Sequence, residues 1–138
     1  MSPDPRFVLD ASALLAYLQD EPGAGRVEEV LNPDHGALIS AANWAETLSK
    51  LAERGLDPDA EADRLVNEGI VGEALTVCPL DEPTAREIAR LRPLTASIGL
   101  SLGDRACLAL ARTLRLPVLT TEGLWQKIDL GVDVEKIR

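Results

Sequence analysis

The sequence predicts an α/β fold, a doubly wound and mainly parallel β-sheet with helices on both faces. Short apolar segments alternate along the chain with longer segments whose apolar residues recur at helical spacing. Aromatic residues make up only 3% of the chain, so the core must consist mainly of Leu, Ala and Val, as suits helices packed on a buried parallel sheet. The 138 residues contain no repeat and no linker-like tract, which predicts a single domain over residues 1–138.

The expected elements follow in order along the chain. Five short apolar segments predict strands at residues 7–9, 37–39, 75–78, 118–119 and 132–134. The segments between them predict helices at residues 12–18, 23–31, 41–54, 57–68, 81–91 and 103–114. Turn and breaker residues set the boundaries. Gly55 ends one helix, and Pro58 begins the next, because proline is well tolerated in the first turn of a helix.

The apolar stripe of the helix expected at 41–54 predicts which residues that helix buries. Its members are Ala41, Trp44, Ala45, Leu48, Leu51 and Ala52. Glu46 lies off the centre of this stripe, on a face shared with Asn43 and Lys50. In the helix expected at 103–114, the buried face contains Leu108 and Ala111, and Asp104 lies at the N-terminal end of the same face. An acid at the end of a buried face is costly unless something compensates its charge.

Charge and targeting signals restrict the class of protein. The net charge is −9, which counts against a nucleic-acid binder, because such proteins usually carry a basic stripe. Carboxylates that bind metal would account for part of this charge. The arginines gather in two segments, at Arg86, Arg90, Arg92, Arg112 and Arg115.

The chain carries no sign of export or membrane insertion. It has neither a signal-peptide pattern at its start nor an apolar run of about 18 residues, so we expect a cytoplasmic protein without a membrane span. Cys78 and Cys107 form no CxxC motif and lie in apolar context, which predicts reduced, buried thiols.

Four acidic residues are predicted to meet at one edge of the sheet. Asp10 directly follows the first expected strand, and Glu122 comes just after the fourth. Glu46 lies early in the helix after the second strand, and Asp104 lies in the first turn of the helix before the fourth. Ligands of open parallel sheets bind beyond the carboxyl ends of the strands, so this edge is the expected site.

Each acid also has a structural interpretation. Asp10 and Asp104 suit the start of a helix, where they cap the backbone or interact with the helix dipole. Glu46 and Lys50 are spaced as a surface ion pair, and Glu122 follows two threonines in a possible turn. The shared position of all four favours a site.

The ligand types indicate which metal such a site would bind. Carboxylate oxygens suit Mg²⁺ or Mn²⁺, whereas zinc normally takes histidine or cysteine ligands. The only histidine, His35, falls in an expected turn and is interpreted as solvated.

The same residues resemble the PIN-domain ribonucleases, in particular the VapC-type toxins of toxin–antitoxin pairs. The opening FVLDASALLA at 7–16 looks like that family's first strand with its first acid, and NWAE at 43–46 is similar to its N-x-A-E segment. SLGDRACLALA at 101–111 resembles its third block, and LTTEGLW at 119–125 its fourth. Glu122 stands where the family more often has Asp.

The resemblance implies the doubly wound sheet, RNA as substrate, a divalent metal, a homodimer, and a small antitoxin protein that blocks the site. We therefore expect hydrolysis of RNA phosphodiesters by a metal-activated water. Asp10 and Asp104 would ligate the main metal, and Glu122 would help to hold a second ion. Glu46 would also belong to the metal site and would orient or deprotonate the attacking water.

Three polar residues are expected to fix the carboxylates through hydrogen bonds: Ser12, Asn43 and Thr120. Asp129, seven residues after Glu122, is a weaker candidate for the same part of the site.

Two other functions fit parts of the sequence. Asp10 could be the nucleophile of a phosphoaspartate enzyme, although Ser12 stands where dehalogenase-like sites carry a second acid and no receiver-type Lys is evident. The chain could also be a non-catalytic acidic domain that binds a protein, which its net charge favours.

Overall fold

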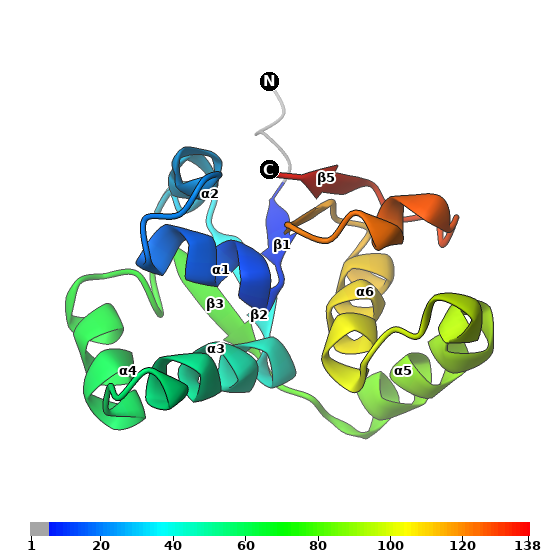
Figure 1. The fold of residues 1–138 in the computed structure, drawn as a ribbon, viewed down its shortest axis with the longest axis horizontal. Coiled ribbons are helices and arrows are strands. Elements are labelled where there is room, and N and C mark those ends of the chain that lie inside the picture. The colour runs from blue at the N-terminus through cyan, green and yellow to red at the C-terminus, as the bar shows by residue number, and fades with distance from the viewer. Residues whose placement is uncertain (1–5) are drawn as a thin grey trace.

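The computed structural model describes residues 6–138 and contains one five-stranded sheet (Figure 1). The strands pair in the order β3-β2-β1-β4-β5, and every pair is parallel. Their bounds are β1 Phe7–Leu9, β2 Ala37–Ser40, β3 Leu75–Cys78, β4 Val118–Thr120 and β5 Val134–Lys136. The predicted parallel sheet is confirmed.

Within residues 6–138, six α-helices and two 3₁₀ turns connect the strands. The α-helices are α1 Ala11–Leu18, α2 Ala24–Val30, α3 Ala41–Glu53, α4 Pro58–Asn67, α5 Glu82–Thr95 and α6 Leu102–Leu114. The 3₁₀ turns are η1 Ala96–Ile98 and η2 Leu124–Lys127. No helix among residues 6–138 is both long enough and apolar enough to cross a membrane.

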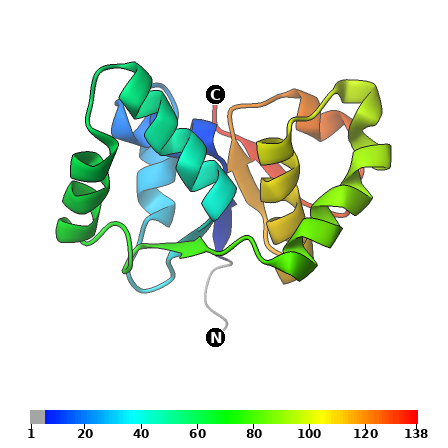
Figure 2. The same ribbon diagram turned by 90° about the horizontal axis from the view of Figure 1, so that it is seen from below.

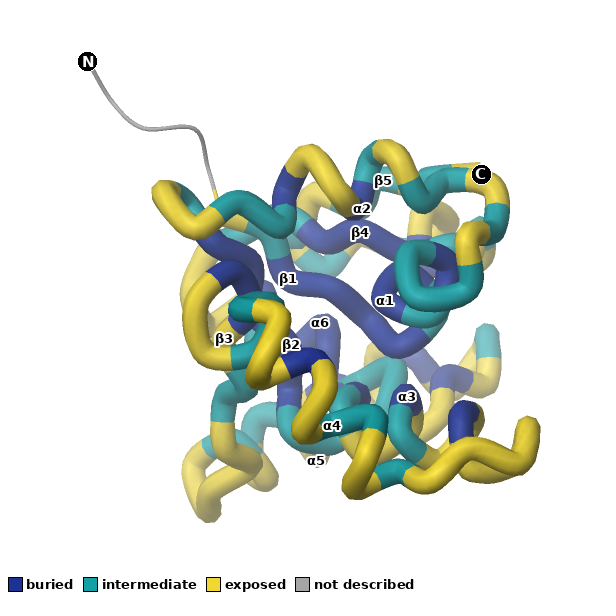
Figure 3. Tube along the Cα trace, turned by 90° about the vertical axis from the view of Figure 1, so that its left-hand side faces the viewer, coloured by how far each residue is buried: buried dark blue, intermediate teal, exposed yellow. Residues whose placement is uncertain are grey.

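Helices cover both faces of the sheet because neighbouring strand residues point to opposite sides. Val8 and Val118 pack against α5 and α6, whereas Leu9 and Leu119 pack against α1 and α2. Figure 1 shows these two helix pairs on either side of the strands, and Figure 3 shows β1 and β4 buried between them. The doubly wound arrangement predicted from the sequence is confirmed.

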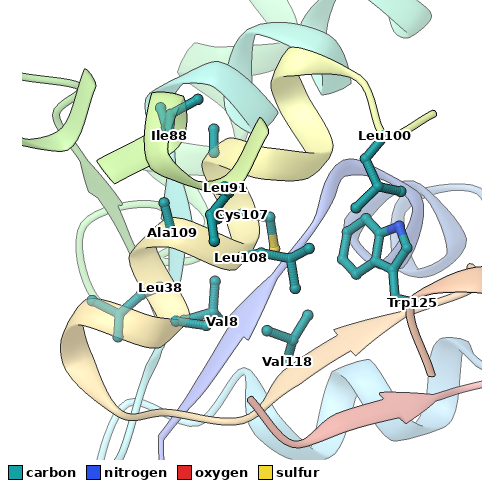
Figure 4. Packing of buried hydrophobic residues seen from close by; sticks show 12 residues of the cluster. Val8, Leu38, Ile88, Leu91, Leu100, Cys107, Leu108, Ala109, Val118 and Trp125 are labelled. Carbon is teal, nitrogen blue, oxygen red and sulfur yellow. The ribbon is translucent and has the colours of Figure 1, made fainter. Parts of the chain in front are cut away.

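Trp125, in η2, anchors the segment after β4 to the core. The indole is 2% exposed and lies among Leu100, Val118 and Leu108 of α6 (Figure 4). The segment from Thr120 to Trp125 is therefore held against the end of the sheet.

Three helices begin at the carboxyl edge of the sheet. α1 starts directly after Asp10, α3 starts directly after Ser40, and α6 brings its first turn to the same edge. α3 contacts both α1 and α6 and therefore lies across the carboxyl edge of the sheet (Figure 2, where α3 is teal and α6 is gold). The chain therefore builds one pocket from three helix N-termini.

Several sequence predictions were wrong in detail. The last strand is Val134–Lys136 rather than 132–134, because Val132 packs against the core from the preceding loop. α5 continues past Leu91 to Thr95 despite Pro93, and the Thr95 hydroxyl donates to the Leu91 carbonyl (2.8 Å), which stabilises this last turn.

Burial also departs from the sequence predictions in α3 and at one cysteine. The buried residues of α3 are Asn43, Thr47 and Leu51, and Ala45 and Ala52 are exposed. This stripe is partly polar because the Thr47 hydroxyl donates to the Asn43 carbonyl (2.9 Å), which satisfies both groups. Cys107 is buried as predicted, but Cys78 is only half-buried, because its strand lies at the edge of the sheet.

Candidate active site

The four predicted acids line one pocket of about 190 Å³ at the carboxyl edge of the sheet. The residues around it are Asp10, Ala11, Ser12, Leu15, Asn43, Glu46, Lys50, Asp104 and Glu122. Two of the three predicted supporting residues, Ser12 and Asn43, are among them, and Thr120 lies directly behind Asp10. Asp129 does not line this pocket; its carboxylate accepts a hydrogen bond from the Gly131 amide instead.

Asp10 is held by three hydrogen bonds and is only 4% exposed. Its Oδ1 accepts from the Ala13 amide (2.9 Å) and the Ser12 hydroxyl (2.7 Å), and its Oδ2 accepts from the Thr120 hydroxyl (2.6 Å). The bond to Ala13 makes Asp10 the N-cap of α1, so the structural interpretation of this acid is correct. The same carboxylate lines the pocket, which shows that capping and a place in the site are compatible.

The two hydroxyl groups that hold Asp10 also hold the turn after β4. Ser12 Oγ accepts from the Thr121 amide (3.0 Å), and Thr120 Oγ1 accepts from the Glu122 amide (3.0 Å). Each hydroxyl proton then points to Asp10. This network fixes the backbone of Glu122 relative to Asp10, while the Glu122 side chain is exposed at the rim of the pocket.

Burial raises the pKa of Asp10 from 3.8 to about 6, although the hydrogen bonds from Thr120, Ala13 and Ser12 act in the opposite direction. The negative charge of Asp104 raises this pKa further. A buried carboxylate whose pKa is raised lacks a compensating cation, and such groups concentrate at functional sites.

Glu46 lies beside Asn43 at the start of α3. The Asn43 side chain is 2% exposed, and its Nδ2 donates to Glu46 Oε1 (3.2 Å) and to the Gly103 carbonyl (3.0 Å). Partial burial, followed by the charge of Asp104, raises the pKa of Glu46. Lys50 does not pair with Glu46 in the way the spacing suggested; its Nζ lies 3.5 Å from Glu53.

Asp104 occupies the first turn of α6, where it completes a capping box. Its Oδ2 accepts from the Ser101 amide (3.0 Å), and its own amide donates to the Ser101 hydroxyl (3.1 Å). The helix-start interpretation of Asp104 is therefore correct, as it is for Asp10. The thiol of Cys107 lies buried nearby, and its pKa is raised by burial and by the charges of Asp10, Asp104 and Glu46.

Among residues 6–138, Lys50 is the one basic residue that lines the pocket. Three of the clustered arginines pair with glutamates of α5 instead: Arg86 with Glu82, and both Arg90 and Arg112 with Glu87. His35 lines a different pocket, at the amino ends of β1 and β2.

The donor set of the pocket fits a hydrated divalent cation. Within residues 6–138, no three acidic, histidine or cysteine side chains stand close enough to form a closed metal cage. Mg²⁺ is usually held by one or two carboxylates together with waters and substrate phosphates, so a closed cage is not required. The buried Oδ1 of Asn43 has no hydrogen-bond partner among the described residues, which adds another oxygen at this edge.

Sequence reasoning missed Gly103. Its carbonyl accepts from Asn43, and the Glu46 carboxylate lies where a side chain at position 103 would be. The sequence did hold one sign that Gly103 matters: it is a glycine in the first turn of a helix, where most other residues are better helix formers.

Comparison with known proteins identifies the family. The model of the PIN domain matches residues 7–129, which is most of the chain. This chain belongs to the PIN-domain family. A relative of this family, ribonuclease VapC from Mycolicibacterium smegmatis, is 32% identical over 116 residues, which cover 82% of this chain and 88% of the relative.

Two further matches are a partial sequence match and a match of fold. Ribonuclease VapC30 of Mycobacterium tuberculosis is 43% identical over 52 residues, and the match spans only 40% of that relative's length and 38% of this chain. The toxin–antitoxin complex from Klebsiella pneumoniae has a chain of the same fold, with a TM-score of 0.70, 17% identity, and coverage of 96% of this chain and 98% of that chain.

Proposed function

We propose that this PIN-domain protein is an endoribonuclease that hydrolyses RNA phosphodiesters with Mg²⁺ or Mn²⁺. The observation that carries the proposal is the meeting of Asp10, Glu46, Asp104 and Glu122 around one pocket, in which Asp10 is buried. The names of the ribonuclease relatives support RNA as substrate. The PIN-domain match removes the support for a phosphoaspartate enzyme.

The position of each carboxylate suggests a different role in the reaction. Asp10 and Asp104 would hold the main metal, because Asp10 is fixed by three hydrogen bonds and Asp104 by its capping box. When bound, the metal would lower the pKa of a water and neutralise charge on the phosphoryl group. Glu46, whose pKa is raised by desolvation and by the charge of Asp104, would contribute to the metal site, orient the attacking water and take its proton. Glu122, exposed at the rim, would help to hold a second ion.

Asn43, Ser12 and Thr120 would keep these carboxylates in place. Each donates a hydrogen bond to a carboxylate of the pocket: Asn43 to Glu46, and the two hydroxyls to Asp10. Lys50 would receive a phosphate of the RNA, since it is the one cation in the lining.

Replacing Glu46 with glutamine tests the catalytic role given to its carboxylate. We expect wild-type protein to cleave RNA with Mn²⁺ and not with EDTA, and Glu46→Gln to slow cleavage by about 100-fold or more. The measurement is digestion of total cellular RNA followed by sequencing of the new ends, which also gives the site preference. Glu28→Gln, an exposed acid of α2, is the matched control and should cleave normally. Equal rates for Glu46→Gln and Glu28→Gln would remove Glu46 from the mechanism.

The non-catalytic alternative is tested by the same proteins. An acidic domain that only binds a protein would show neither cleavage nor specific Mn²⁺ binding, whatever the variant. Calorimetric titration with Mn²⁺ therefore decides between the two functions.

We also propose that the protein is the homodimeric toxin of a toxin–antitoxin pair, a single domain over residues 1–138 that acts in the cytoplasm. The VapC relatives and the toxin–antitoxin complex of the same fold support this part of the proposal. An acidic pocket of about 190 Å³ is a suitable receptor for an arginine side chain of an inhibitor, which would pair with its carboxylates.

Co-expression should reveal the inhibitor. We expect the small protein encoded beside this chain to co-purify with it and to suppress RNA cleavage, and expression of this chain alone to arrest growth. Growth rate and cleavage are measured with and without the neighbour. Harmless expression in the absence of the neighbour would contradict the toxin role, although the nuclease activity could still stand.

A further inference from the structure

Gly103 is the second residue of α6, a position where alanine would stabilise the helix more than glycine does. Its backbone does not require glycine, because its φ lies outside the left-handed region. A reason for this glycine must therefore come from its neighbours.

The neighbour is the carboxylate of Glu46, on α3. A Cβ at position 103 would overlap Glu46 Oε1 and would lie 2.7 Å from its Cδ and 3.3 Å from its Oε2. Real Cβ atoms essentially never approach another heavy atom more closely than 3.0 Å, so the carboxylate would have to move. Backbone contacts reinforce this arrangement, because the Gly103 carbonyl accepts from Asn43 Nδ2, which also donates to Glu46 Oε1.

We propose that Gly103 is a positioning residue, whose missing side chain lets the Glu46 carboxylate lie against α6 on the same pocket as Asp104. It does not touch the reacting groups and acts only through Glu46. The inference rests on the role given to Glu46 in the proposed function. Because the displaced atoms are the far end of a flexible side chain, a methyl group at position 103 moves the carboxylate and leaves the helices in place.

Alanine substitution tests this directly. Gly103→Ala is expected to lower kcat/KM for RNA cleavage with Mn²⁺ by about 10- to 100-fold, as loss of a supporting contact at a metal site does. Its Mn²⁺ affinity should fall as well, while its melting temperature in EDTA stays the same or rises. Gly25→Ala in α2 is the matched control, since a Cβ there meets nothing within 4 Å, and it should match wild type in both cleavage and Mn²⁺ affinity.

A shorter acid should rescue the variant. Aspartate at position 46 withdraws the carboxylate by one methylene, so Gly103→Ala combined with Glu46→Asp should cleave at least as fast as Gly103→Ala alone. The combined loss is then smaller than the product of the two single losses, which a general loosening of the fold would not produce.

Two results would overturn the inference: wild-type cleavage and Mn²⁺ affinity in Gly103→Ala, or independent losses in the double variant. The proposed function fails separately, if wild-type protein cleaves no RNA. In that case the Mn²⁺ affinities of Gly103→Ala and Gly25→Ala alone decide the role of Gly103.

Discussion

Replacing Asp10 with asparagine is expected to abolish metal-dependent RNA cleavage while making the protein more stable at neutral pH. The loss should be about 1000-fold, because a metal ligand contributes several kcal/mol to charge stabilisation in the transition state. Asparagine keeps the shape and accepts the hydrogen bond from Ala13, so the cap of α1 survives. Cleavage assays with Mn²⁺ and EDTA measure the loss. Near-full, EDTA-sensitive activity in Asp10→Asn would exclude Asp10 as a ligand.

The gain in stability has a definite pH dependence. The pKa of Asp10 is raised from 3.8 to about 6 by burial, so the folded state holds this proton more tightly than the unfolded state. The stability of wild-type protein therefore falls, through this group, as the pH rises from about 4 to about 6. Relative to wild type, Asp10→Asn should gain roughly 3 kcal/mol of unfolding free energy across this range. Urea unfolding of both proteins at pH 4 and pH 7 without metal measures it, and a pH-independent difference would contradict the assignment.

Truncating Trp125 is expected to cost roughly 3–5 kcal/mol of unfolding free energy, as for other large buried side chains. That is a large share of the roughly 5–15 kcal/mol that stabilises an ordinary domain. The indole is buried against Leu100 and Val118, and alanine would leave most of its volume empty (Figure 4). Chemical unfolding of Trp125→Ala gives the cost directly.

Its neighbour provides the control for Trp125. Leu124 belongs to the same 3₁₀ turn but is 45% exposed, so Leu124→Ala should change stability by no more than about 0.5 kcal/mol. If both variants lost a similar amount of unfolding free energy, the contribution of this turn to stability would come from its backbone, and burial of the indole would not be the main cause.

The sequence predicted the sheet well because its strands are short, apolar and bounded by turn residues. It predicted that the acids share one pocket because a parallel sheet brings the ends of its strands together, which places Asp10 near Glu122. It also posed capping and metal binding as alternatives for Asp10 and Asp104. Both carboxylates cap a helix and line the pocket, so for these residues the two interpretations were never exclusive.

The remaining features depend on contacts between residues far apart in the chain. Asn43 and Thr47 were not predicted to be buried, because a polar side chain can be buried only where partners satisfy it. The partner of the Asn43 side chain is the Gly103 carbonyl, sixty residues away, and helical periodicity carries no information about it. The ion pair between Arg112 and Glu87 likewise depends on the packing of α6 against α5, whereas Arg86 and Arg90 pair with glutamates only three or four residues away within α5.

The three helices that begin at the pocket bear on how an acidic protein can attract a polyanion. Each helix N-terminus carries a partial positive charge of roughly half a unit, from amides that side-chain charge counts omit. At two of these starts the positive charge already faces a carboxylate, because Asp10 caps α1 and Asp104 completes the capping box of α6. Four acids and one lysine, among the described residues, line the pocket, so RNA should bind there well only when a divalent cation reverses the local charge.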